Sequence, residues 1–263
     1  MDFAGLSVPN RPDKPRTLGQ TWIIDDGVPL GYFRDVIQSA YPWIDGVKFG
    51  WGTGLVTPRL AEKIDILRDF AIDFTFGGTL FEWFYAQGRF TDFVEWCQRW
   101  EARTVEVSSG VLDLPQLEKT RIIRELSSRF RVFSEVGPKD VHAADSWTHQ
   151  DWIDRIETDL NAGAAMVVLE TREFGMGGLC DSDGHIRVTV VDEILMTSLP
   201  TSRFLWEAPT KSHQTYWIKR LGPNVNLANI PMTQPIAVET LRRGLRADTM
   251  HMVTAVLGVD YDA

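Results

Sequence analysis

Short apolar runs and longer amphipathic stretches alternate along the chain, a pattern typical of βα units around a parallel sheet. The short runs have four to six residues, are rich in β-branched and aromatic side chains, and predict eight strands. These strands are expected over residues 21–25, 46–49, 72–76, 104–107, 131–136, 166–170, 203–207 and 224–228.

The intervening stretches predict helices. Leu60, Ile64 and Leu67 recur at helical spacing in the segment PRLAEKIDILRDF. Pro115 suits the first turn of a helix, and Gly163 suits the position that ends one. Helices are therefore expected over residues 58–70, 91–100, 115 to about 130, and 151–162.

Eight strands with helices between them predict an α/β fold, a single (β/α)8 TIM barrel, because such barrels often run to roughly 250 residues as one domain. A doubly wound open sheet is the alternative, but DDGVPLG follows the first predicted strand in place of a glycine-rich phosphate turn. We expect an N-terminal arm over residues 1–19, the catalytic barrel over 20–250 and a C-terminal tail over 251–263.

Composition excludes several classes of protein. The chain of 263 residues has 27 Lys and Arg against 36 Asp and Glu, and this acidic balance disfavours binding to nucleic acid. Two cysteines cannot form a disulfide scaffold or a Cys-rich zinc site. Neither a membrane-spanning run nor the apolar core of a signal peptide is present in the sequence, so we expect a cytoplasmic protein without a membrane partner.

Charged residues stand at the carboxyl ends of the predicted strands, which face the active-site mouth of a barrel. Charges enter such a place only with partners, so a mixed ring indicates a site for a metal and an anion together. Three carboxylates suit a hard divalent ion such as Mg2+, and four cations suit phosphate, sulfonate or carboxylate groups. The carboxylates are Glu135, Glu170 and Glu207, and the cations are Lys48, Lys139, Arg172 and Lys211.

Two places are candidates for an anion site. Barrel enzymes typically bind phosphate after strands seven and eight. The residues there are Lys211, Ser212, Gln214, Asn226 and Asn229. The Gly77-Gly78-Thr79 turn after the third strand could also cradle an anion with backbone N–H groups, or it could be an ordinary βα turn.

Several collinear segments carry a resemblance to a known family. They are GVKFGWGT (46–53), GGTLFE (77–82), SEVG (134–137) followed by Lys139, DLNAGA (159–164), ETRE (170–173), FLWEAPTKSHQ (204–214), NVNLANI (224–230) and ETLRRGLRADT (239–249). Together they cover most of the chain from about residue 20 to residue 250. The sequence resembles the phosphosulfolactate synthase family.

The resemblance implies a TIM barrel that adds sulfite to phosphoenolpyruvate with Mg2+, giving (2R)-3-phosphosulfolactate on the way to coenzyme M or sulfolactate. Mg2+ would stabilise the enediolate-like charge that forms when sulfite attacks the methylene carbon. We expect Lys139 to protonate the central carbon, with its pKa lowered by a cationic site. Lys48 and Arg172 would hold sulfite or the carboxylate. Lys211 and Ser212 would hold the phosphate, together with the backbone of strand eight.

One departure leaves alternatives open. The family usually reads S-D-G-S after the fourth strand, whereas residues 108–111 read S-S-G-V. A related barrel enzyme with another nucleophile or another enolpyruvyl acceptor would look similar. A non-catalytic member, like the heat-stress-associated relative in plants, is a third hypothesis, and it predicts loss of the strand-end charges. The apolar and basic tail leads us to expect a homo-oligomer, with a trimer as the expected form.

Overall fold

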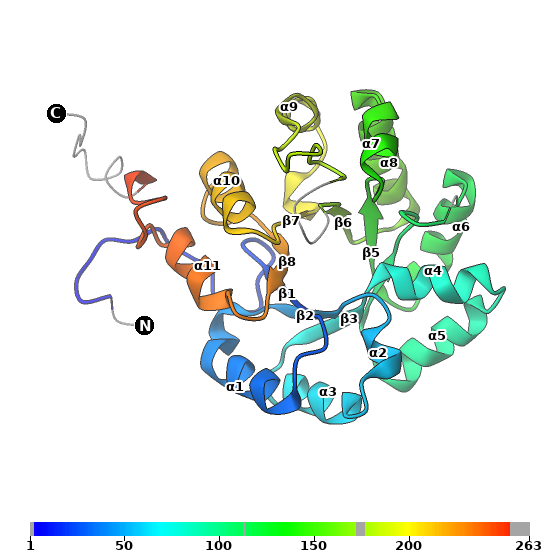
Figure 1. Ribbon diagram of the computed structural model, residues 1–263, viewed down its shortest axis with the longest axis horizontal. Helices are drawn as coiled ribbons and strands as arrows, with labels where there is room; N and C mark the ends of the chain where they lie inside the picture. The colour runs from blue at the N-terminus through cyan, green and yellow to red at the C-terminus, as the bar shows by residue number, and fades with distance from the viewer. Residues whose placement is uncertain (1–2, 113, 172–176, 253–263) are drawn as a thin grey trace.

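The computed structural model describes residues 3–112, 114–171 and 177–252 (Figure 1). Within these ranges eight parallel strands form one sheet in the order β3-β2-β1-β8-β7-β6-β5-β4. The strands are β1 (Thr21–Asp25), β2 (Gly46–Phe49), β3 (Asp73–Phe76), β4 (Thr104–Val107), β5 (Arg131–Val136), β6 (Met166–Leu169), β7 (Phe204–Glu207) and β8 (Leu227–Pro231).

Helices surround the strands (Figure 1). They are α1 (Leu30–Ala40), α2 (Thr53–Val56), α3 (Leu60–Asp69), α4 (Gly78–Ala86), α5 (Phe90–Arg99), α6 (Gln116–Ser127), α7 (Val141–Ser146), α8 (His149–Ala162), α9 (Val188–Met196), α10 (Lys211–Leu221) and α11 (Pro235–Arg242). Gly163 ends α8 in the left-handed conformation, as predicted. No helix among the described residues is both long and apolar enough to cross a membrane.

The barrel closes between β3 and β4, the two ends of the hydrogen-bonded order. Side chains bridge this seam: the Thr104 hydroxyl donates to the Asp73 carboxylate over 2.6 Å, and the Gly78 backbone N–H donates to Glu106 over 2.7 Å. The arrangement confirms the predicted single (β/α)8 TIM barrel.

The predicted eighth strand is wrong by three residues, since β8 covers Leu227–Pro231 and not residues 224–228. Asn226 directly precedes the strand, and its side-chain hydrogen bonds link the start of β8 to the neighbouring chain segments. Its side-chain oxygen accepts from the Gln20 backbone N–H, and its amide donates to the carbonyl of Phe204, the first residue of β7. Asn226 therefore lies at the amino ends of the strands, opposite the expected mouth.

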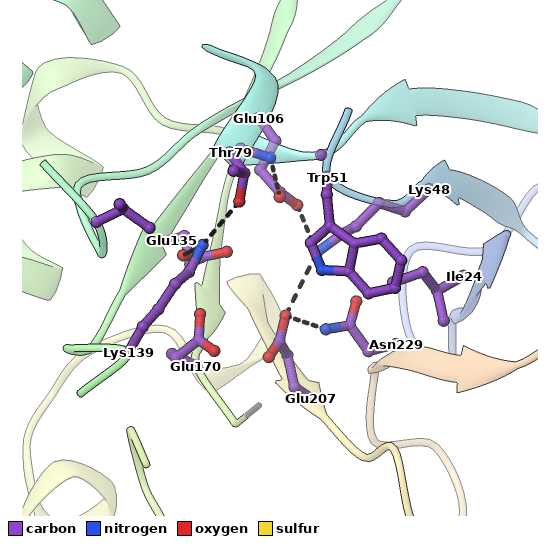
Figure 2. A pocket seen from close by; sticks show the side chains of 13 residues that line it. Ile24, Lys48, Trp51, Thr79, Glu106, Glu135, Lys139, Glu170, Glu207 and Asn229 are labelled. Carbon is purple, nitrogen blue, oxygen red and sulfur yellow. Dashed lines mark hydrogen bonds and ion pairs between the residues drawn. The ribbon is translucent and has the colours of Figure 1, made fainter. Parts of the chain in front are cut away.

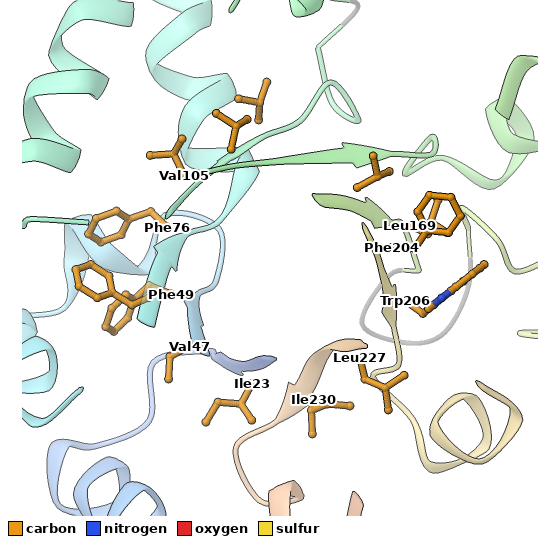
Figure 3. Packing of buried hydrophobic residues seen from close by; sticks show 14 of the residues in the cluster. Ile23, Val47, Phe49, Phe76, Val105, Leu169, Phe204, Trp206, Leu227 and Ile230 are labelled. Atoms are coloured by element: carbon orange, nitrogen blue, oxygen red, sulfur yellow. The ribbon is translucent and has the colours of Figure 1, made fainter. Parts of the chain in front are cut away.

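Side chains inside the barrel form layers because alternate strand residues point inward. The apolar inward residues form one cluster, which consists of Trp22, Phe133, Met166, Val168, Leu205 and Ala228. Gly46 makes room for it, because a Cβ at this position would lie 2.4 Å from the Trp22 ring. The outward-pointing residues pack against the helices in a larger core (Figure 3).

The charged layer follows from the same two-residue period. Glu135 stands two residues beyond Phe133, Glu170 two beyond Val168, and Glu207 two beyond Leu205. Each carboxylate is therefore carried inward, one layer nearer the carboxyl ends than the apolar floor. Glu135 and Glu207 lie on β5 and β7, and Glu170 directly follows the last residue of β6.

A buried ion pair behind β5 supports this layer. Asp159 accepts from Lys119 over 2.8 Å and from Ser134 over 2.6 Å, and Lys119 also donates to the Glu135 carbonyl over 2.6 Å. Replacing Asp159 with alanine leaves the Lys119 ammonium buried without its carboxylate. We expect the free energy of unfolding to fall by about 3–5 kcal/mol in chemical denaturation.

Arg121 provides the control. It lies on α6, the helix that carries Lys119, and its ion pairs with Glu118 and Glu125 are exposed. Arg121→Ala should change the midpoint of unfolding little, since exposed pairs contribute little. An Asp159→Ala loss no larger than that of Arg121→Ala would contradict the role of the buried pair.

Candidate active site

A cavity of about 210 Å³ opens at the carboxyl ends of the strands (Figure 2). Its lining brings together residues from β1 to β8 and from the loops that follow them. These are Ile24, Lys48, Trp51, Gly77, Gly78, Thr79, Glu106, Val111, Glu135, Lys139, Glu170, Glu207 and Asn229.

Three buried carboxylates form the centre of the cavity. One oxygen from each of Glu135, Glu170 and Glu207 lies within 4.8 Å of the others. Burial raises the pKa of Glu170 well above its ordinary value, and the two neighbouring carboxylates raise it further. Burial also raises the pKa of Glu207, to about 7, although Lys48 opposes the shift. The pKa of Glu135 is lowered to about 2, because Lys139 and Lys48 outweigh the effect of burial.

This cluster fits a divalent cation. Carboxylate oxygens are the ligands that hard cations prefer, and burial together with mutual repulsion raises two of the three pKa values. A bound cation would relieve that repulsion. The structure brings together Glu135, Glu170 and Glu207, the three acids that the sequence pattern groups, and their role as metal ligands stays a prediction.

Lys48 extends from β2 and lies between a carboxylate of β4 and a carboxylate of β7. Its Nζ is 2.8 Å from Glu106 Oε2 and 3.3 Å from Glu207 Oε1, and the side chain is buried. Burial alone would lower the pKa of Lys48, but Glu106, Glu207 and Glu135 outweigh it and raise the pKa. Lys48 therefore stays charged and offers a fixed positive group inside the cavity.

Lys139 enters from the loop after β5. Its Nζ is 3.1 Å from Glu135 Oε1 and 3.9 Å from Glu82 Oε1, and it donates to the Thr79 hydroxyl over 3.3 Å. The expected lowering of its pKa is wrong for this structure. Burial acts in that direction, but Glu135, Glu170 and Glu82 outweigh it, so the pKa of Lys139 is raised.

Two further acids were not among the sequence-based site residues. Glu106 lies on β4 beside Lys48, and the Thr104–Glu106 period could have placed it in the charged layer. Glu82 lies on α4, accepts from the backbone N–H groups of Val111 and Leu112 over 2.8 and 2.6 Å, and holds the loop after β4. Nothing in the sequence indicates that the side chain of Glu82, which lies on a helix, is buried.

Gly78, Thr79 and Asn229 do line the cavity. The Gly78 N–H is already used by Glu106, and a Cβ on Gly78 would lie 2.6 Å from the Ser108 Cβ, so close packing requires this glycine. Asn229 donates its side-chain amide to Glu207 Oε1. Its own Oδ1 is buried and has no hydrogen-bond partner among the described residues.

The structure does not bring the other predicted phosphate residues into this cavity. Lys211 and Ser212 line a separate surface hollow on α10, where Lys211 pairs with Asp248 over 2.8 Å. Gln214 is buried and donates to the Ala208 carbonyl and to Gln234. These residues belong to the first turn of α10, and Asn226 lies at the opposite end of the barrel. Arg172 lies outside the described residues.

Stability should report the protonation of the cluster. Because the folded protein raises the pKa of Glu207 to about 7, the contribution of this group is full at low pH and is lost as pH rises through about 7. We expect the metal-free protein to lose up to about 1.4 kcal/mol per pH unit from this group between about pH 4.5, its ordinary pKa, and about pH 7, with little further change at higher pH.

Chemical denaturation in EDTA at each pH measures the effect, with Glu207→Gln as the reference because it cannot titrate. The difference between the two proteins should change with pH in this window, and Mg2+ should offset the loss in the unaltered protein. A difference that is constant from about pH 5 to 7 would contradict the shifted pKa.

A (β/α)8 barrel whose carboxyl mouth joins a buried carboxylate cluster to the buried Lys48 and the partly buried Lys139 defines a TIM-barrel enzyme. The family described as (2R)-phospho-3-sulfolactate synthase (ComA) matches residues 9–248. The phosphosulfolactate synthase of Bacillus subtilis (strain 168) is 45% identical over 251 residues, which cover 95% of this chain and 99% of the relative. The chain belongs to the phosphosulfolactate synthase family.

A second relative agrees, and a solved structure matches the fold. The phosphosulfolactate synthase of Methanothermobacter thermautotrophicus is 38% identical over 257 residues, covering 96% of this chain and 99% of the relative. A monomeric dihydrodipicolinate synthase variant has a TM-score of 0.55 at 13% identity, over 92% of this chain and 77% of that one. At this identity the likeness concerns the fold alone.

Proposed function

We propose that this protein adds sulfite to phosphoenolpyruvate in a Mg2+-dependent reaction that yields (2R)-3-phosphosulfolactate. Family membership over almost the whole chain supports the reaction class. The observation that carries the assignment to this mouth is the meeting of three buried carboxylates with Lys48 and Lys139 in one cavity. Both substrates are anions, so a site for them needs positive charge held in place.

The chain's own residues supply that charge. Lys48 is held by Glu106 and Glu207 and faces the cavity as a permanent cation. It would offset the repulsion between sulfite and phosphoenolpyruvate and keep the two anions in contact. Mg2+ held by Glu135, Glu170 and Glu207 would act as a Lewis acid on the acceptor carboxylate.

Lys139 would provide the proton. After sulfur bonds to the methylene carbon, the central carbon needs a proton from one face, and an ammonium fixed beside Glu135 and Thr79 can deliver it from one direction. The raised pKa of Lys139 comes from carboxylates, Glu135 first among them. When the Glu135 oxygens take another cation, that effect weakens and the ammonium becomes a better acid.

The alternatives are less well supported. A non-catalytic member would be expected to lose the strand-end charges, but Lys48, Glu135, Lys139, Glu170 and Glu207 all line the cavity. The trimer and the cytoplasmic location expected from the sequence stay predictions; light scattering of the purified protein would measure the first.

The experiment is an incubation of the purified protein with phosphoenolpyruvate, sulfite and Mg2+, followed by mass spectrometry. We expect a product with the mass of phosphoenolpyruvate plus sulfurous acid, with no release of inorganic phosphate. EDTA should stop the reaction and added Mg2+ should restore it. If this product does not form, even after more Mg2+ or freshly prepared enzyme is added, the proposal is refuted.

A further inference from the structure

A second cavity adjoins the reaction cavity at the same mouth. Its volume is about 300 Å³, larger than the 210 Å³ of the reaction cavity, and the two share Ile24, Trp51 and Asn229 in their walls. We call it the apolar annex; the rest of its lining is Asp26, Val28, Tyr32, Pro209, Pro231, Met232 and Thr233.

The annex has the wrong chemistry for either proposed substrate. None of the described residues that line it carries a positive charge, and Asp26 is an acid. An anionic group would lose its hydration there without gaining a partner. The remaining lining is mostly apolar, so the annex suits an uncharged apolar group. Sulfite has no such group, and phosphoenolpyruvate has only its reacting methylene.

The wall between the two cavities contains a β-bulge in β8. β8 contains one residue more than β1 between the pairs Thr21–Leu227 and Ile23–Ile230, and Asn229 lies in this bulge with φ of 54°. Bulges at barrel rims redirect side chains near active sites. Here the bulge places Asn229 against Glu207 on one side and along the annex on the other.

Trp51 forms the opposite part of the wall. Its backbone is also left-handed, with φ of 46°, and Figure 2 shows its ring beside Lys48, Ile24 and Asn229. Two non-glycine residues in this conformation carry an energetic cost that the surrounding fold must offset. Because the two cavities share this wall, the annex lies next to the cavity in which Lys48 and Lys139 would hold the reacting anions.

We propose that the annex receives the organic group of a sulfinate, R–SO2−, and that the enzyme forms sulfones from sulfinates and phosphoenolpyruvate. This inference rests on the proposed addition of sulfite. A sulfinate keeps the nucleophilic sulfur lone pair and a single negative charge, with R in place of one sulfite oxygen. A substituent on the acceptor would instead hinder attack at the reacting carbon.

The reaction balances without a redox partner. The sulfur lone pair forms the C–S bond to the methylene carbon, the π electrons of the double bond move to the central carbon, and Lys139 gives that carbon a proton that solvent later replaces. No group leaves, and the phosphate stays on the product. An apolar cavity of about 150 Å³ accommodates benzene, so the annex has room for a phenyl group.

The test uses the full-length protein with Mg2+ and phosphoenolpyruvate, and supplies benzenesulfinate, methanesulfinate or sulfite in parallel, with enzyme-free controls. Mass spectrometry should detect the phosphorylated phenyl sulfone. We expect kcat/KM for benzenesulfinate to exceed that for methanesulfinate by about tenfold or more, since the larger group fills the annex.

A variant links the activity to the annex. Thr233 lines the annex and is exposed, so Thr233→Trp fills the space with little risk to folding, and Thr233→Ser is the matched control. We expect Thr233→Trp to lower kcat/KM for benzenesulfinate by about tenfold or more and to leave the sulfite reaction within twofold.

Normal sulfite turnover without any sulfone would overturn the inference while leaving the proposed function intact. So would a sulfone activity that Thr233→Trp does not change. Absence of both products would instead refute the proposed function on which the inference rests.

Discussion

Replacing Lys139 with methionine is expected to lower kcat for sulfite addition by about 10²–10⁴-fold, the usual contribution of a general acid. Methionine retains most of the side-chain volume but has no proton to give. The ammonium it removes lies 3.1 Å from Glu135 at the cavity wall. Lys48 and the carboxylate cluster remain, so phosphoenolpyruvate should still bind. Steady-state kinetics gives kcat, and calorimetric titration gives the affinity for phosphoenolpyruvate.

The matched control is Lys211→Met, since Lys211 lies on the surface of α10 and pairs with Asp248. Its kcat and KM should both stay near those of the unaltered enzyme. If Lys139→Met abolishes binding of phosphoenolpyruvate, Lys139 clamps the substrate; if kcat falls less than tenfold, another group donates the proton. Either result would end the assignment of Lys139 as the acid.

Glu170→Gln is expected to weaken Mg2+ binding by more than about 100-fold, because even partners one step removed from a metal ligand change affinity by 10–100-fold. Glu170 interacts with both Glu135 and Glu207, and burial raises its pKa well above the ordinary value. The neutral amide removes this repulsion. The metal-free variant should therefore be more stable than the unaltered protein and gain little stability from Mg2+. Thermal unfolding with and without Mg2+ measures both effects.

A second acidic group of the chain provides the control. Asp181, Asp183 and His185 also place ligand atoms within 4.8 Å of one another, but at the surface. Asp181→Asn should leave the response to Mg2+ unchanged. Equal stabilisation of Glu170→Gln and the unaltered protein by Mg2+ would show that the cation binds elsewhere.

The fold and the carboxylate cluster could be predicted because both depend on local periodicity. Strand residues alternate inward and outward, so an apolar inward residue followed two positions later by an acid places that acid in the mouth of a barrel. Phe133 with Glu135 and Leu205 with Glu207 follow this rule. Neighbouring parallel strands then bring such acids together at the same end.

The phosphate residues could not be predicted in the same way. Lys211 follows the end of β7 by only a few residues, but this spacing in the sequence does not show which way its side chain points. In the structure Lys211 lies in the first turn of α10, at the outer surface. Asn226 was misplaced because β8 begins one residue after it, at Leu227, and its side chain binds the Gln20 backbone N–H at the amino ends of the strands. The raised pKa of Lys139 comes from Glu135 first, then from Glu170, and then from Glu82, which reaches the site from a helix.

Addition of sulfite at this mouth is tested most directly by running the reaction in D2O and examining the product by NMR and mass spectrometry. An ammonium such as that of Lys139 exchanges with solvent, and it would deliver one deuteron to the central carbon from one face. We expect phosphosulfolactate of a single configuration with one deuterium at carbon 2 and none at carbon 3. Absence of phosphosulfolactate, a mixture of configurations, or deuterium at carbon 3 would contradict the proposed reaction.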